Sequence, residues 1–467
     1  MRTAWRRHLT MKGTFLALFL VAAGIISPAA AFSGLADRVS ETILPNGLKV
    51  LLLENHKAPV FTFQVWYRVG SRNEEWGRTG LSHMLEHMMF KGTKRFGPEE
   101  FSRIIQENGG DDNAFTSTDY TAYFENLSAD RVGVALDLEA DRLQSLLLRE
   151  EDFHTERLVV MEERRMRTED NPQAFIQEEV NAVAFQLQPY HWPTIGWMED
   201  IRRFTLEDLK NYYRTYYNPV NAFLVVVGDF KKEELLPRIQ AAFGSIPRGV
   251  PPHQEESIDP PQSGERRIVV KREARLPYLL MGYHVPNLRD QDSYVLEVIA
   301  TLLAGGKSSR FYRDLVQKRE LALSAEAEHS LLSRDPNLFL ISAQPLPGKD
   351  VTTVEKALDH EIERLRRDPV GLRELEKAKN LLEVSFISGQ DSMFFQAMLL
   401  AQYEIASTWR AADDYLPFIR KISPEDILRV ANQYLVRDRR TVGLLVPVPS
   451  TKETPEPGFS VKSKIVR

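Results

Sequence analysis

A weak internal repeat is the feature that most constrains how this chain can fold. The segment 205–209 (TLEDL) recurs as 423–427 (SPEDI), 218 residues further on, and each copy begins with a residue that commonly caps a helix. The apolar segment 223–227 meets 441–445 at the same offset, and the alternating segment 60–69 predicts a half-buried strand. Self-similarity at this period indicates two homologous halves. We expect an α+β fold in which each half is a mostly antiparallel sheet packed with helices.

Shifts in composition divide the chain into five segments. Residues 248–264 contain two Pro-Pro pairs among polar residues, which is typical of an interdomain linker. The expected organisation is a signal peptide (1–31), an N-terminal domain (32–247), the linker (248–264), a homologous C-terminal domain (265–450) and a C-terminal tail (451–467).

The first 31 residues have the composition of a secretory signal peptide. Arg2, Arg6 and Arg7 precede an apolar run over 15–26, and small residues end the segment at Ala31. This order predicts export, with cleavage after Ala31 and a periplasmic location. The alternative is an uncleaved membrane anchor. No later apolar run reaches the length of a transmembrane helix, so no stable membrane span is expected after cleavage.

Charge and cysteine content exclude several classes of function. The 60 basic and 65 acidic residues are mixed along the chain and give a net charge of −5, so no basic face for nucleic acid is expected. There is no cysteine. A metal site in this chain must therefore use nitrogen and oxygen ligands, and a cysteine nucleophile is excluded.

The sequence HMLEH at residues 83–87 is the strongest chemical signal in the chain. In a helix, His83 and His87 lie one turn apart on the same face, where both imidazoles can bind one metal ion. Glu86 lies on the same side and can accept a proton from an attacking water, which is the HExxH arrangement of zinc peptidases in reverse. The alternative is a chance grouping in an amphipathic helix, but the apolar neighbours favour a metal site.

A catalytic zinc usually takes three protein ligands and leaves one position for water. The acidic stretch 156–163 offers candidates for the third ligand, because Glu156 and Glu163 are seven residues apart and share a helix face. Spacing does not choose between Glu162 and Glu163. The same stretch also fits a solvated helix with Glu–Arg pairs at four-residue spacing.

Residues 80–93 (GLSHMLEHMMFKGT) resemble the signature of the pitrilysin/insulinase family of zinc peptidases. The chain is most similar to the branch with short subunits, which contains the mitochondrial processing peptidase and bacterial periplasmic homologues. Further similarity at 109–117 and 189–193 extends the match over nearly the whole mature chain. The resemblance implies that Glu163 is the third ligand of one Zn²⁺ per chain and that Glu156 is a carboxylate that orients the site.

The resemblance also implies an activity and a mode of substrate binding. The chain would be a zinc metalloendopeptidase that cleaves unfolded peptides or precursor segments, with Glu86 as the general base. Its N-terminal domain would carry the zinc, its C-terminal domain would lack a metal site, and together they would form half of a clamshell. The peptide substrate would lie as an added strand on a sheet edge formed by Asn113, Ala114, Phe115 and Thr116. From the residues alone, 113–124 is simply a strand after a Gly-Gly turn.

One stretch departs from the family pattern. Full-length members carry, in the C-terminal half, an arginine and a tyrosine that hold the substrate backbone near the zinc, but Val316 and Leu323 occupy these positions here. Neither side chain can hydrogen-bond a substrate or stabilise an oxyanion. We therefore expect the zinc-bearing subunit of a heterodimer whose related partner supplies both groups. The alternatives are an active homodimer and a non-catalytic subunit that binds peptides or serves in assembly.

Overall fold

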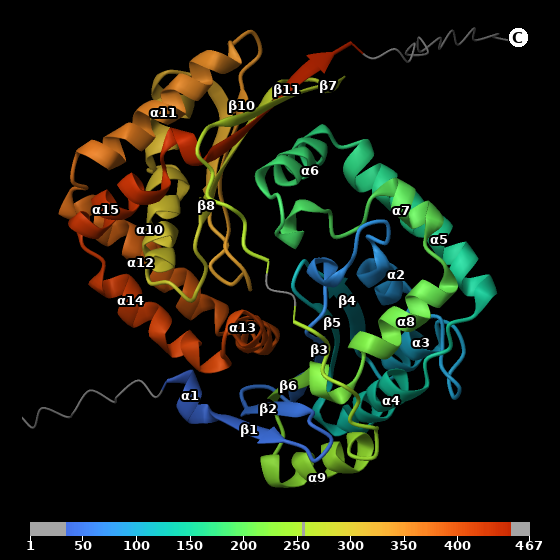
Figure 1. The fold of residues 1–467 in the computed structure, drawn as a ribbon. Helices are drawn as coiled ribbons and strands as arrows, with labels where there is room; N and C mark the ends of the chain where they lie inside the picture. The colour runs from blue at the N-terminus through green and yellow to red at the C-terminus, as the bar shows by residue number, and fades with distance from the viewer. Residues whose placement is uncertain (1–33, 255–256, 450–467) are drawn as a thin grey trace, which may run out of the picture.

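The computed structural model of the protein describes residues 34–254 and 257–449. The predicted signal peptide (1–31) and tail (451–467) lie outside these residues. Figure 1 shows the described chain as two lobes, each built of helices around a sheet. None of the helices in the described ranges combines the length and the apolar character that crossing a membrane requires.

The two lobes contain sheets that share an arrangement of five strands, to which the first sheet adds β1 at one edge. The first sheet, in the order β1-β2-β6-β3-β5-β4, consists of β1 (Val39–Ile43), β2 (Lys49–Glu54), β6 (Ala222–Gly228), β3 (Val60–Tyr67), β5 (Thr121–Ser128) and β4 (Asp111–Thr116). The second, in the order β7-β11-β8-β10-β9, consists of β7 (Arg266–Glu273), β11 (Arg440–Val448), β8 (Tyr278–Val285), β10 (Asn337–Pro345) and β9 (Ala322–Glu328). The parallel pair β2–β6 corresponds to β7–β11, and the antiparallel strands β3, β5 and β4 correspond to β8, β10 and β9. The predicted α+β fold with two homologous halves is confirmed.

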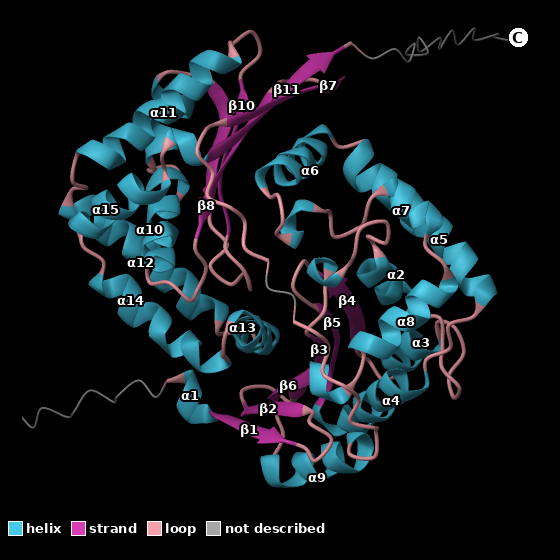
Figure 2. Ribbon diagram, in the orientation of Figure 1, coloured by secondary structure: helices cyan, strands magenta, loops and turns pink. Residues whose placement is uncertain are grey.

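Helices cover the sheets of both halves, and most of these helices lie on the outer sides (Figure 2). Those of the N-terminal half are α1 (Leu35–Arg38), α2 (Leu81–Met88), α3 (Glu100–Glu107), α4 (Val132–Ser145), α5 (Glu150–Arg164), α6 (Pro172–Ala184), α7 (Met198–Arg203), α8 (Leu206–Tyr216) and α9 (Lys232–Phe243). Those of the C-terminal half are α10 (Asp292–Ala304), α11 (Val351–Arg367), α12 (Leu372–Gly389), α13 (Met393–Ala406), α14 (Tyr415–Lys421) and α15 (Pro424–Tyr434). The repeated segments noted above form the N-termini of α8 and α15, and in both a Ser or Thr hydroxyl and an Asp three residues later form a capping box.

Each half contributes one helix to the sheet of the other half. Helix α6 packs on β7, β8 and β11, where Ile176 and Val180 join an apolar cluster with Leu280. Helix α13 packs on β3 and β6, where the buried carboxylate of Glu404 lies 2.6 Å from a guanidinium nitrogen of Arg68. In Figure 1, α6 accordingly lies beside β8, and α13 lies beside β3. We call α6 and α13 the exchanged helices.

The strand predicted over 60–69 is present as β3, but it is buried on both faces rather than half-buried, and helix α13 explains why. All residues of β3 except Val60 are buried, because β3 lies between β5 and β6 and both faces of the sheet are covered. The alternation arises because Thr62 and Gln64 are polar. Gln64 nevertheless lies against the exchanged helix, where its side-chain nitrogen donates a long hydrogen bond (3.5 Å) to the carbonyl of Phe394.

The predicted strand over 113–124 is two strands. β4 ends at Thr116, a turn follows over 117–120, and β5 begins at Thr121. The backbone nitrogen of Ser117 donates to the carbonyl of Tyr120 (2.8 Å), which closes the turn. The turn consists of Ser, Thr, Asp and Tyr, and the side chains of the first three favour turns. The prediction of a single strand after the Gly-Gly turn did not take this signal into account.

The close approach of α6 to the second sheet gives a first prediction. A Cβ atom at Gly443 of β11 would lie 2.4 Å from a methyl group of Val180 and 3.1 Å from Ile176. Gly443→Val is therefore expected to destabilise the protein by about 1–3 kcal/mol through overpacking, although valine favours strands. Denaturant unfolding measures the effect. Gly264→Val, at a position with no atom within 4 Å of the added Cβ, is the matched control, and equal stability of the two variants would contradict this packing.

Candidate metal centre

A buried carboxylate fixes the start of α2, the helix that carries the HMLEH motif. Glu74 accepts hydrogen bonds from the backbone nitrogens of Gly80 (2.6 Å) and Ser82 (2.7 Å), which the first helical turn leaves unpaired. Gly80 has a left-handed backbone (φ 93°), and a Cβ there would lie 2.7 Å from the carbonyl oxygen of Ile195. Burial raises the pKa of Glu74 to about 8 against the effect of these hydrogen bonds. Together these contacts fix the position of the first turn of α2, and thereby the direction in which His83 and His87 point.

Three side chains from two packed helices converge at one point. Helix α2 supplies His83 and His87, α5 supplies Glu163, and one ligand atom from each lies within 4.8 Å of the others. The Glu163 carboxylate lies 3.6 Å from Nε2 of His83 and 3.2 Å from Nε2 of His87. Two imidazole nitrogens and one carboxylate oxygen form a donor set that fits zinc and leaves room for a fourth ligand.

Glu156 supports this group through the other ring nitrogen of His87. Its carboxylate lies 2.9 Å from Nδ1 of His87 and 2.6 Å from Nζ of Lys91. A hydrogen bond donated by Nδ1 to Glu156 leaves Nε2 available to a metal, which is how supporting carboxylates fix the tautomer of a ligand histidine. His83 differs, because its Nδ1 is buried without a hydrogen-bond partner in the described chain.

The carboxylates of Glu156 and Glu163 favour positive charge at the place where the three candidate ligands converge. Burial lowers the pKa of His87, but hydrogen bonds to Glu156 and Glu163 outweigh burial and raise that pKa to about 9. Hydrogen bonds from His83 and His87 lower the pKa of Glu163. Burial opposes ionisation of Glu156, yet hydrogen bonds from His87 and Lys91 leave its pKa below the usual value. The same electrostatic preference suits a divalent cation.

The structure distinguishes the two neighbouring glutamates that spacing left equivalent. Glu163 faces the histidines and is 14% exposed, whereas Glu162 is exposed and pairs with Arg165 (2.6 Å). Arg167 lies 2.9 Å from the Glu163 carboxylate, in the π-helical segment that follows α5. His154, earlier on α5, is exposed and lies 3.6 Å from the carboxylate of Glu150 on the same helix, so it takes no part in the group.

Glu86 connects the motif to the end of β4. The hydroxyl of Thr116 donates a hydrogen bond to the Glu86 carboxylate. Within the described sheet β4 pairs only with β5, so its other edge is open. Asn113, Ala114 and Phe115 lie along this strand, which ends beside Glu86. Nothing in the sequence indicates the contact between Thr116 and Glu86, because the two are 30 residues apart.

Comparison with known proteins identifies the family. The model described as Insulinase (Peptidase family M16) matches residues 49–196, and the model described as Peptidase M16 inactive domain matches residues 203–382. The zinc protease PqqE of Helicobacter pylori is 36% identical over 412 residues, which cover 86% of this chain and 92% of that protein. The chain belongs to the insulinase family of peptidases.

Two further comparisons, one of sequence and one of structure, each cover most of both chains. An uncharacterized zinc protease of Streptomyces coelicolor is 27% identical over 418 residues, which cover 88% of this chain and 90% of that protein. The crystal structure of a protease from Helicobacter pylori matches with a TM-score of 0.83 at 34% identity, covering 88% of this chain and 99% of the other.

The metal centre lies within the first of the two family models and outside the second. Among the residues that the structure describes, His83, His87 and Glu163 form the only group of three or more potential ligands close enough to hold a metal ion, and all lie within the first model. The inactive-domain model covers Val316, in a π-helical turn, and Leu323, which is 47% exposed on β9. The domain limits at 247 and 264 stay a prediction.

Proposed function

We propose that this chain is a zinc metalloendopeptidase that binds one Zn²⁺ per chain through His83, His87 and Glu163. The convergence of these three ligand atoms within 4.8 Å, from two packed helices, carries the proposal. The names of the relatives, which are called zinc proteases, support it as well. The donor set also agrees with a chain that has no cysteine.

Zinc, when bound, makes a coordinated water more acidic and polarises the scissile carbonyl. Glu86 then acts as the general base. One of its carboxylate oxygens takes a proton while the water oxygen attacks the carbonyl carbon, and delivers that proton to the nitrogen of the leaving amine. The Thr116 hydroxyl holds the Glu86 carboxylate. Glu156 holds His87 with Nε2 toward the ligand group.

The substrate peptide would lie as an added strand along β4. Main-chain hydrogen bonds bind an extended peptide with little demand on its side chains. Asn113, Ala114 and Phe115 supply the open edge, and Thr116 brings the strand to Glu86. Substrates would therefore be unfolded peptides or precursor segments, because a folded protein rarely offers a free extended strand.

We further propose that the chain is the zinc-bearing subunit of an exported heterodimer. Val316 and Leu323 offer no hydrogen-bonding side chain where full-length members carry an arginine and a tyrosine. A related partner would supply these groups. Residues 1–31 would direct export to the periplasm and be removed, which would leave 32–247 as the zinc-bearing domain and 265–450 as its homologue.

Purification from the native exported fraction tests both proposals. We expect the purified chain to contain zinc, to hydrolyse an unstructured fluorogenic peptide weakly, and to become strongly active when a related partner subunit is added back. Strong hydrolysis by a homogeneous preparation, undiminished by removal of any second subunit, would favour the homodimer instead. A chain that lacks zinc and stays inactive with its partner would contradict the peptidase and leave a peptide-binding or assembly subunit.

A further inference from the structure

A cavity of about 900 Å³ lies in the C-terminal half, between the π-helical segment η6 (Tyr312–Lys318), α11 and the start of α12. The described residues that line it include none from the candidate metal centre and none from β4. The cavity is therefore separate from the place where a peptide substrate would be cleaved.

Positively charged side chains outnumber carboxylates in this cavity. Six of its lining residues are basic, namely Arg310, Arg313, Lys318, Arg364, Arg373 and Lys377. Its three carboxylates are already paired with arginines, in the pairs Glu374–Arg310 (2.8 Å), Glu361–Arg364 (2.9 Å) and Asp314–Arg319 (3.3 Å). The other four basic residues make no ion pair within the described chain. The cavity therefore attracts anions.

Arg310 has a donor nitrogen without a partner. Its side chain is 9% exposed, and its Nε and Nη2 donate to the Glu374 carboxylate (2.8 and 3.0 Å). Its Nη1 is shielded from solvent and makes no hydrogen bond within the described chain. A buried donor left unpaired is costly, and guanidinium groups pair well with phosphate oxygens. Because Arg310 lines the cavity, this nitrogen indicates a ligand with acceptor oxygens.

The N-terminus of α12 opens on the same cavity. Gly371, the N-cap residue, offers no side-chain acceptor to the first backbone N–H groups, and a Cβ there would meet no atom within 4 Å. Arg373 places a positive charge in the first turn, where the helix dipole disfavours it, and Lys377 adds a like charge one turn further on. An anion bound at this end of the helix would offset both effects.

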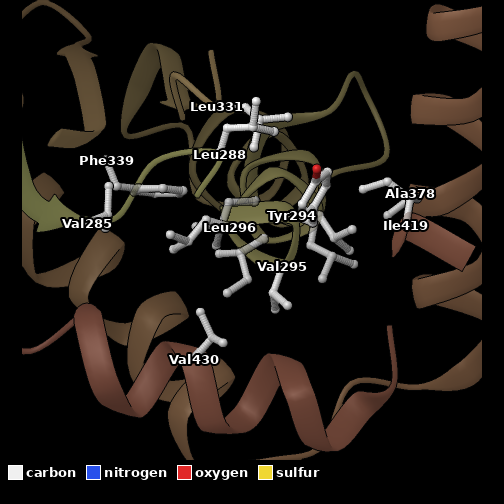
Figure 3. Close-up of a cluster of buried hydrophobic side chains, with 14 of the residues drawn as sticks. Val285, Leu288, Tyr294, Val295, Leu296, Leu331, Phe339, Ala378, Ile419 and Val430 are labelled. Atoms are coloured by element: carbon white, nitrogen blue, oxygen red, sulfur yellow. The ribbon is translucent and has the colours of Figure 1, made fainter. Parts of the chain in front are cut away.

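Beyond the cavity, the same face of α12 is apolar and exposed. Three apolar residues follow Lys377 at helical spacing and are 41–62% exposed, namely Leu381, Val384 and Ile387. The opposite face packs on α10 and α14, and Figure 3 draws Ala378 of that face and Ile419 of α14 in one apolar cluster. Helices that lie on membrane surfaces combine basic and apolar residues in this way.

We infer that the C-terminal half binds the surface of a membrane that contains anionic phospholipids, with lipid phosphate groups in this cavity and the apolar residues of α12 against the lipid. The four basic residues without an ion pair complement the negative charge of such a surface. Phosphate oxygens would accept hydrogen bonds from Nη1 of Arg310 and from the first backbone N–H groups of α12. The inference goes beyond the proposed peptidase and does not depend on it.

Vesicle binding by the chain from residue 32 onward tests the inference, because the apolar run over 15–26 is then absent. Co-sedimentation compares vesicles of phosphatidylcholine with vesicles that also contain phosphatidylglycerol. We expect binding to the anionic vesicles to be stronger on the order of 10-fold or more, and to weaken in high salt. Equal binding to both kinds of vesicle, or to neither, would overturn the inference. Binding of free tripolyphosphate without binding to vesicles would also overturn it, because the site would then serve a soluble anion.

Removal of two positive charges assigns the preference to the cavity. Arg373→Gln combined with Lys377→Gln should lower binding to anionic vesicles on the order of 10-fold. Lys349→Gln combined with Lys356→Gln is the matched control, because it removes the same charge from exposed positions of the C-terminal half outside the cavity. Equal binding by the two double variants would overturn the inference.

A second pair of variants tests the apolar contact. Val384→Ser should weaken binding to anionic vesicles by about 3-fold or more, because less apolar surface then leaves water. Val250→Ser makes the same change at an exposed valine of the linker and should bind as the parent does. If Val384→Ser left vesicle binding unchanged but weakened a complex with a partner subunit, the exposed face of α12 would belong to that partner and the inference would be overturned.

Discussion

Replacing Glu86 with glutamine is expected to lower kcat for peptide hydrolysis by about 10²- to 10⁴-fold while zinc stays bound, because the amide cannot accept the proton of the attacking water. The substitution keeps the size of the side chain and its hydrogen bond with Thr116. The measurements are zinc content by elemental analysis and steady-state hydrolysis of an unstructured peptide, in the presence of the partner subunit if activity requires one.

Glu162→Gln is the matched control for this prediction. It makes the same chemical change on an exposed carboxylate that pairs with Arg165, so both zinc content and kcat should equal those of the parent. A Glu86→Gln protein that binds zinc and cleaves peptide as fast as the parent would remove Glu86 from the chemistry. Loss of zinc in that variant would instead make Glu86 a ligand.

Three glutamates on α5 should have graded effects on zinc affinity. Glu163→Gln removes a charged donor from the ligand group and is expected to cause the largest loss. Glu156→Gln weakens only the support of His87 and should cost about 10–100-fold in affinity. Glu162→Gln should cost nothing. Competition with a chromogenic chelator measures all three constants.

The order of these losses is the decisive outcome. If Glu162→Gln weakened zinc binding more than Glu163→Gln, the assignment of the third ligand would be wrong. If Glu156→Gln had no effect on affinity, the contact of 2.9 Å with His87 would have no supporting role.

Much of the fold was predictable because its determinants are local and repeated. The capping boxes at Thr205 and Ser423 recur at one spacing, and they begin equivalent helices in the two halves. The two incorrect predictions concern the burial of the strand over 60–69 and the turn at 117–120 that divides the strand predicted over 113–124. Thr62 and Gln64 of β3 suggested a solvated face, and no pattern within 60–69 indicates that a helix from the other half covers it.

In the candidate site, too, the features set by local spacing could be predicted from the sequence, and those set by tertiary packing could not. His83 and His87 could be paired from helical spacing, since both lie on one helix. Choosing Glu163 over Glu162 required either the family resemblance or the packing of α5 on α2, because spacing along one helix cannot tell which side faces another. The contact between Glu86 and Thr116 and the cap that Glu74 provides depend on tertiary packing alone.

The exchanged helices bear on how a peptide could reach the open edge of β4. A fragment ending at residue 247 would uncover the sheet face on which α13 packs and would leave α6 without its sheet, so neither lobe is complete alone. The two lobes exchange one helix each, as the subunits of a domain-swapped dimer do, but here a covalent linker joins them. Swinging them apart would tear both helices from their sheets and expose apolar surface. In the proposed heterodimer, a long peptide would therefore enter by movement between the two chains rather than by opening within one.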